Sequence, residues 1–168
     1  MTLFLLFSLW TQSSYAMKPA PFTPVQYTTE DASLFLNSHP ETNKTQLSNA
    51  QGEILWIMNE YIGRRKIFLS PDGNTLVLFG NLYFGHLLTQ NEDAAVLYVY
   101  EKGLLQQTYT FSAFFGFSIA EARKRFDIPI MSGGWIPFLR YVTIDEIDWK
   151  KRIFFLTFQD KEKRESSF

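Results

Sequence analysis

The chain has 168 residues, with 16 Lys and Arg against 17 Asp and Glu, and it contains no cysteine. This charge balance argues against a nucleic-acid partner, and the missing cysteine excludes disulfides, thiolate chemistry and Cys-ligated zinc. Phe, Tyr and Trp together make up 17% of the residues. Because aromatic side chains favour strands and fill cores, the composition predicts a β-rich protein.

The first sixteen residues have the layout of a secretory signal peptide. An apolar run over 3–7 precedes a polar stretch, and the small residues Ser14 and Ala16 stand where signal peptidase requires them. Residues 1–16 carry no Lys or Arg, and Met17 is an alternative translation start. The run is shorter than the roughly 20 apolar residues of a membrane-spanning helix, so no transmembrane anchor is expected after cleavage. Without disulfides, this leader predicts a periplasmic or secreted bacterial protein.

A single β-rich domain is expected over residues 31–160. Residues 17–30 contain three prolines and are expected to form an extended leader, and residues 161–168 are expected to form a frayed charged tail. Residues 37–52 are rich in Asn, Ser, Thr and Gln. We expect them to be a loop that follows a short strand over 33–36.

Strong strand signals begin at residue 54. After a strand over 54–58, residues 67–79 contain the turn Ser-Pro-Asp-Gly between two apolar runs, which predicts a hairpin because proline and glycine supply the dihedrals of a tight turn. A second hairpin is expected from 95–100 and 104–111. Both arms of the first hairpin are apolar on both faces, which predicts a four-stranded antiparallel meander covered on both sides.

The segment from Phe68 to Val77, with its Ser-Pro-Asp-Gly turn, and the segment from Leu97 to Leu105 resemble one blade of the WD40-like or TolB-type β-propeller repeat. The meander is also similar to that of uncharacterised exported bacterial proteins. The resemblance covers about residues 64–111; it implies a blade-like sheet and no catalytic residue. A closed propeller needs at least four blades of about 40 residues. We therefore expect a mainly β fold, blade-like or sandwich in type, and not a closed propeller.

The pattern changes after Phe111. Ser118 and Glu121 have the spacing of a capping box, which predicts one short helix near 118–126. A loop over 131–135 and a last hairpin within 139–158 are expected to follow.

Five aromatic residues are the candidate ligand- or partner-binding residues: Phe114, Phe115, Phe117, Trp135 and Trp149. If they remain exposed, they would form an apolar patch for a protein, peptide or glycan. The alternative is that these rings belong to the core at the open end of the sheet.

A glycan-acting hydrolase is the second hypothesis for function. Asp145, Glu146 and Asp148 crowd the chain just before Trp149. A glycosidase needs two carboxyls facing each other about 5 to 9.5 Å apart, with Trp149 or Trp135 as a sugar platform. Acidic residues in a solvated hairpin are the alternative explanation.

Two other chemistries have weaker signals. Residues 116–120 imitate the nucleophile elbow of serine hydrolases, but no histidine follows His86, and Ser118 is already assigned to the helix cap. His39 and His86 are the only histidines and lack metal-ligand spacing, so no metal and no cofactor are expected. We therefore expect a non-enzymatic exported binding or envelope accessory module. Self-association is possible, because open strand edges invite pairing.

Overall fold

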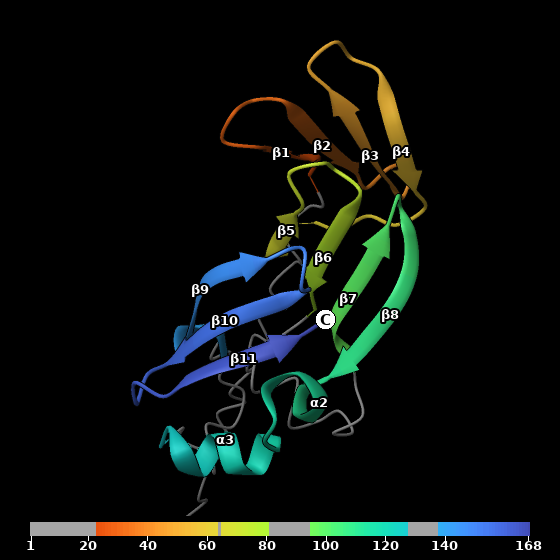
Figure 1. The fold of residues 1–168 in the computed structure, drawn as a ribbon. Coiled ribbons are helices and arrows are strands. Elements are labelled where there is room, and N and C mark those ends of the chain that lie inside the picture. The colour runs from red at the N-terminus through yellow and green to blue at the C-terminus, as the bar shows by residue number, and fades with distance from the viewer. Residues whose placement is uncertain (1–22, 64, 81–94, 128–137) are drawn as a thin grey trace, which may run out of the picture.

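A computed structural model describes residues 23–63, 65–80, 95–127 and 138–168. These residues form three antiparallel sheets with two short helices (Figure 1), so the expected mainly β fold without a closed propeller is confirmed. The predicted signal peptide, Trp135 and His86 lie outside the described residues. The described helices are α2 (Phe111–Phe115) and α3 (Ile119–Arg125), and neither is long and apolar enough to cross a membrane.

The first sheet corrects two expectations. Its order is β1-β2-β3-β4, with bounds Val25–Thr28, Leu34–His39, Lys44–Asn49 and Ile54–Met58. The expected leader therefore contains a strand, and most of the expected loop over 37–52 is a hairpin. Only the strand over 54–58 matches its predicted bounds.

Buried hydroxyls explain why a polar segment forms strands here. Ser38 and Thr45 face each other across β2 and β3, and their hydroxyl oxygens lie 2.8 Å apart. The Ser38 oxygen accepts from the backbone N–H of Ile62 at 3.0 Å, and the Thr45 hydroxyl donates to the Glu60 carbonyl at 2.6 Å. Because each buried polar group has a partner, the pair costs little inside the core.

The second sheet is the expected meander. Its order is β5-β6-β7-β8, with bounds Ile67–Leu69, Thr75–Phe79, Ala95–Glu101 and Leu104–Thr110. Leu76 and Leu78 belong to one buried cluster, whereas Val77 and Phe79 belong to another. The prediction that this sheet is covered on both sides is therefore confirmed for β6, although most of β8 is exposed.

The third sheet has the order β11-β10-β9, with bounds Lys163–Ser167, Ile153–Phe158 and Val142–Asp148. The predicted helix is confirmed as α3, Ile119–Arg125, and both hydrogen bonds of its capping box form. A second helix, α2 at Phe111–Phe115, was not predicted: the Thr110 hydroxyl caps its start and Gly116 ends it in the left-handed conformation. A single 3-10 turn, Phe138–Arg140, precedes β9.

Strand β11 corrects the expectation of a frayed tail over 161–168. The Ser166 hydroxyl donates to the Phe114 carbonyl, and the Arg164 guanidinium lies directly over Gly116. Phe168 is buried, with its ring centroid 4.7 Å from that of Phe154. The alternate residues of this charged segment therefore dock it onto α2 and the core.

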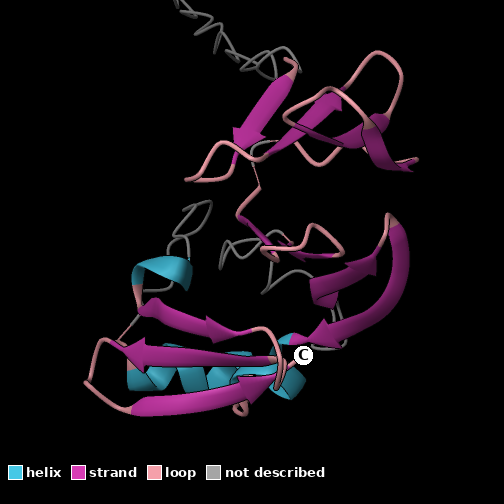
Figure 2. Cartoon of the chain, turned by 45° about the horizontal axis from the view of Figure 1, so that its top comes forward, coloured by secondary structure: helices cyan, strands magenta, loops and turns pink. Residues whose placement is uncertain are grey.

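The three sheets are layered, with the second sheet between the other two (Figure 2). One cluster joins the first and second sheets and includes Leu36, Leu47 and Trp56. The other joins the second sheet to the third sheet and to both helices, and it is rich in phenylalanine. The first sheet thus lies at one end of the stack.

The first two sheets repeat one structural unit. In the β1–β2 turn, Asp31 accepts from the Thr29 hydroxyl at 2.7 Å, and Ala32 has φ 54°. In the β5–β6 turn, Asp72 accepts from the Ser70 hydroxyl at 2.6 Å, and Gly73 has φ 70°. The unit of the first sheet was not recognised from the sequence because Thr-Glu-Asp-Ala stands where the second has Ser-Pro-Asp-Gly.

The strand register repeats as well. Thr28 pairs with Phe35 as Leu69 pairs with Leu76, and Gln26 pairs with Asn37 as Ile67 pairs with Leu78. Strands β4 and β8 both carry an irregularity after their first paired residues. The paired residues Gln26, Thr28, Phe35 and Asn37 of the first sheet therefore have structural counterparts in Ile67, Leu69, Leu76 and Leu78 of the second.

Candidate binding surface

The aromatic candidates from α2 are core residues. Phe114 and Phe115 are 1% and 0% exposed. Their ring centroids lie 4.9 Å apart, and Phe114 also contacts Phe79 and Phe154 edge-on, at 5.7 and 5.5 Å. Neither side chain is available to a partner in this structure. Both rings belong to the core, which is the alternative considered for them above.

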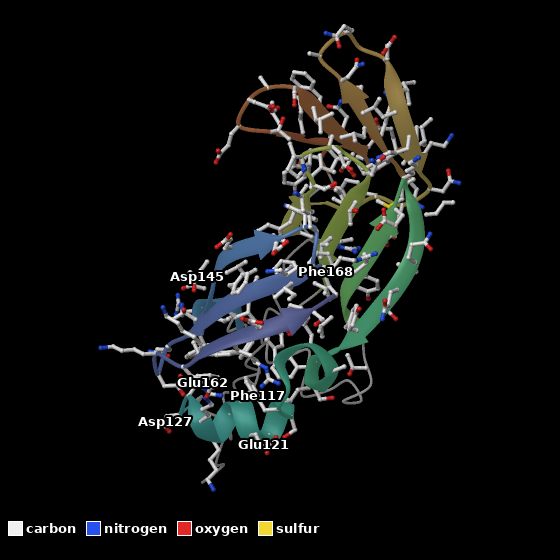
Figure 3. All side chains as sticks on the ribbon, viewed as in Figure 1. Phe117, Glu121, Asp127, Asp145, Glu162 and Phe168 are labelled. Carbon is white, nitrogen blue, oxygen red and sulfur yellow. The ribbon has the colours of Figure 1, made fainter. Side chains whose placement is uncertain are left out.

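Phe117 and Trp149 are partly buried against the same core. Phe117 lies between α2 and α3 (Figure 3), and the Arg125 guanidinium stands 5.2 Å from its ring centroid. Trp149 contacts Phe168 edge-on at 5.8 Å, so its ring is engaged by the end of β11. Trp135, the remaining candidate, lies outside the described residues. The described aromatic candidates thus form no exposed platform.

The carboxylates of the hydrolase hypothesis have structural partners. Asp148 accepts from the backbone N–H groups of Lys150 and Lys151 at 3.1 and 3.0 Å, which closes the β9–β10 turn. The N–H of Lys151 is the main cause that holds the pKa of Asp148 below its ordinary value. A glycosidase acid requires the opposite shift. Asp145 accepts from the Thr157 hydroxyl at 2.5 Å and lies on β9, away from α3 (Figure 3).

The remaining chemical motifs also have local roles. The Ser118 hydroxyl accepts from the Glu121 N–H at 3.1 Å, which is the helix cap expected from the sequence. Exposed His39 lies 3.1 Å from Glu41 on the β2–β3 turn. Within the described segments, no three His, Asp or Glu side chains are grouped so that they could hold a metal ion.

The outer face of the first sheet differs from other surfaces of the described chain in its lack of charged residues. Strand alternation points Leu36, Leu47 and Trp56 into the core, so their neighbours point outward. We call this outer surface the neutral face; its residues are Gln26, Thr28, Phe35, Asn37, Gln46, Ile54 and Ile57, together with Ser48, which is buried at 8% exposure. None of them is charged. The next pair along, His39 opposite Lys44, carries the first formal charge.

Aliphatic side chains are concentrated on the β4 edge of the neutral face. Ile54 and Ile57 are 54% and 46% exposed, and Leu55, the extra residue at the β4 irregularity, is 45% exposed. The tip of the β7–β8 hairpin abuts this edge, because a Cβ on Gly103 would lie 2.8 Å from the Ile57 carbonyl oxygen. Leu104 and Leu105, 67% and 53% exposed, follow that tip.

The outer face of the third sheet is of the opposite kind. We call it the acidic face; its charged residues are Asp145, Glu146, Asp148, Lys163 and Glu165. This is the composition expected of a sheet surface that meets water. The contrast within one molecule shows that the lack of charge on the neutral face is specific to that face.

Sequence reasoning did not identify the neutral face. The interpretation of 37–52 as a loop removed two of its strands from the analysis. The signal that could have identified them is the alternation of buried Thr45 and Leu47 with outward Gln46, together with the buried Leu34 and Leu36 that flank Phe35.

No protein-family model matches the chain. A search of curated proteins also gave no match.

Proposed function

We propose that the protein is an exported, non-enzymatic module of the bacterial envelope, and that its neutral face binds the surface of another protein molecule. The exposure of Ile54, Leu55 and Ile57 on a face without charge carries this proposal. Interface centres are depleted in charged residues, and contiguous exposed apolar side chains mark interaction sites.

A protein surface suits this face better than a glycan does. The large exposed side chains are aliphatic, whereas Trp56 is buried and Trp149 packs against the core. Asp148 closes the β9–β10 turn, where its pKa lies below the ordinary value, and Asp145 accepts from the Thr157 hydroxyl, so both carboxylates that the hydrolase hypothesis names already have structural partners. The layout of residues 1–16 supports export to the periplasm or medium.

Site-specific photocrosslinking in producing cells tests this function. A photoreactive benzoylphenylalanine replaces Ile57, and the matched control replaces Leu104, which is more exposed but lies outside the neutral face. We expect protein adducts from position 57 and few from position 104. Equal yields, or no adduct from position 57, would contradict the proposal. Hydrolysis of fluorogenic glycosides that Asp145→Asn abolishes would favour the hydrolase instead.

A further inference from the structure

We propose that the neutral face binds the neutral face of a second copy of this chain, so that two copies form a two-fold dimer. This inference rests on the proposed function, because it names the protein surface that the face would bind. It follows from the repeat, from the contrast between the two outer faces and from the charges at the ends of the first sheet.

The repeat identifies the shape that fits the neutral face. Its residues Gln26, Thr28, Phe35 and Asn37 correspond to Ile67, Leu69, Leu76 and Leu78 of the second sheet. Those four residues are packed in the cluster between the first and second sheets. The neutral face therefore occupies the position at which, one unit later in the stack, another sheet packs. A sheet is the expected partner.

The acidic face of another copy is a poor choice for that sheet. Head-to-tail stacking would place Asp145, Glu146 and Glu165 over the uncharged residues of the neutral face, with Lys44 only at its end. Burying carboxylates without a partner is unfavourable. A second neutral face brings no charge into the contact, so the isologous arrangement avoids this cost.

The charges at the two ends of the first sheet fix the orientation. Glu30, Asp31 and Glu53 lie in the two turns at one end, which contain no Lys or Arg. At the opposite end Lys44 begins β3, and Lys102 lies on the hairpin tip that abuts Ile57. A two-fold axis that lies in the plane of the contact and runs across the strands places each acidic end over the lysine end of the other copy and keeps the acidic ends apart.

The lysine end also carries two carboxylates, of which one is paired with an arginine and the other with a histidine, which is neutral in the formal charge count at pH 7. Glu60 is 3.1 Å from Arg65, and Glu41 is 3.1 Å from His39. Lys44, on the same side of β3 as Gln46, is therefore the cation of the outer face that meets the acidic turns of the second copy.

The size of the face sets the strength of the dimer. Four strands span about 19 Å and five residues about 17 Å, or about 320 Å² of plane for each copy. The two copies together contribute about 640 Å², which is below the roughly 1,200 Å² of standard interfaces, so we expect only weak, reversible association in the micromolar range or weaker.

Sedimentation velocity of the exported, cleaved chain tests the dimer over about 5 to 500 µM. We expect the mass to rise from monomer toward dimer. Ile57→Arg should weaken association at least about tenfold, because it buries a charge, while Leu104→Arg should follow the wild type. Gln46→Lys places like charges near the axis, and added salt should partly restore its association. Circular dichroism of each variant checks its fold.

Two results would overturn the dimer. They are a monomeric wild type over the whole range, and growth to species larger than a dimer, which head-to-tail stacking produces. If the chain is monomeric but photocrosslinking from position 57 still gives adducts with a different protein, the dimer is refuted and the proposed function is supported. No adduct of any kind from Ile57 would remove both.

Discussion

Two positions with the same backbone conformation and different surroundings make a matched test of how the first sheet packs on the second. Gly73 has φ 70° in the β5–β6 turn, and its counterpart Ala32 has φ 54° in the β1–β2 turn. A Cβ on Gly73 would lie 2.9 Å from Cδ2 of Leu47 and 3.2 Å from Cδ1 of Leu34, both in the first sheet. Ala32 is exposed and already holds a Cβ. Of the two positions, only Gly73 is crowded by side chains of a neighbouring sheet.

The expected changes in unfolding free energy follow from these surroundings. For Gly73→Ala, left-handed backbone strain costs about 1–2 kcal/mol and the crowding of two leucines about 1–3 kcal/mol. A stiffer unfolded chain offsets about 0.4–1 kcal/mol, which leaves a net loss of about 1–5 kcal/mol. For Ala32→Gly the strain is relieved and the unfolded chain gains entropy, so we expect a change between zero and about 1 kcal/mol of added stability.

Urea unfolding measures both changes, and fluorescence of buried Trp56 is a direct probe because its indole N–H donates to the Gly73 carbonyl at 2.7 Å. If Gly73→Ala costs less than about 1 kcal/mol, backbone strain alone accounts for it and the leucines do not cover the turn. That result would refute the packing of the first sheet on the second. Equal and opposite changes at the two positions would point to the same conclusion.

Three further predictions concern other parts of the chain. Phe168→Ala should cost about 3 kcal/mol in urea unfolding, because it removes a buried ring beside Phe154; a loss below about 1 kcal/mol would show that the end of β11 is not docked. The hydrogen bond from the Ser70 hydroxyl is the largest cause that lowers the pKa of Asp72 in the folded protein. Ionised Asp72 should therefore stabilise the fold fully above about pH 4, the pKa of the unfolded chain, and this stabilisation should be lost as the pH falls through the lower pKa of the folded state. Thermal melts of Asp72→Asn should therefore approach the wild type at low pH, and a constant gap would contradict this. Mass spectrometry of the exported chain should show cleavage after Ala16.

The parts of the fold that the sequence predicted have local signals. The Ser-Pro-Asp-Gly hairpin needs only its own turn residues, and the α3 cap needs only Ser118 and Glu121. The strands β2 and β3 depend instead on hydrogen bonds made at a distance: the Ser38 hydroxyl is satisfied by Ile62 and the Thr45 hydroxyl by Glu60. No pattern within residues 37–52 shows those partners.

The candidate site was missed for a related reason. Aromatic density directed attention to Phe114 and Phe115, yet density does not reveal which side of a sheet a ring will face. The burial of Phe114 depends on contacts with Phe79 and Phe154, which lie on different sheets, and Phe115 packs on Phe138. The order of the sheets in the stack determines which aromatic side chains are exposed. That order can be predicted only if the first sheet is recognised as a repeat of the second.

The composition of the neutral face distinguishes a docking surface from a simple end cap. A terminal repeat needs a polar outer face to stay soluble, and this accounts for Gln26, Thr28 and Asn37 in place of Ile67, Leu69 and Leu78. The need for a polar outer face does not account for the β4 edge, where Ile57 is about half exposed. The residue at the corresponding place in β8 is the polar Thr108, so a polar side chain fits this position of the repeat. Solubility alone would also favour charge, as on the acidic face. A surface that is polar enough to stay in water alone, but has no charge to desolvate on contact, is suited to reversible binding.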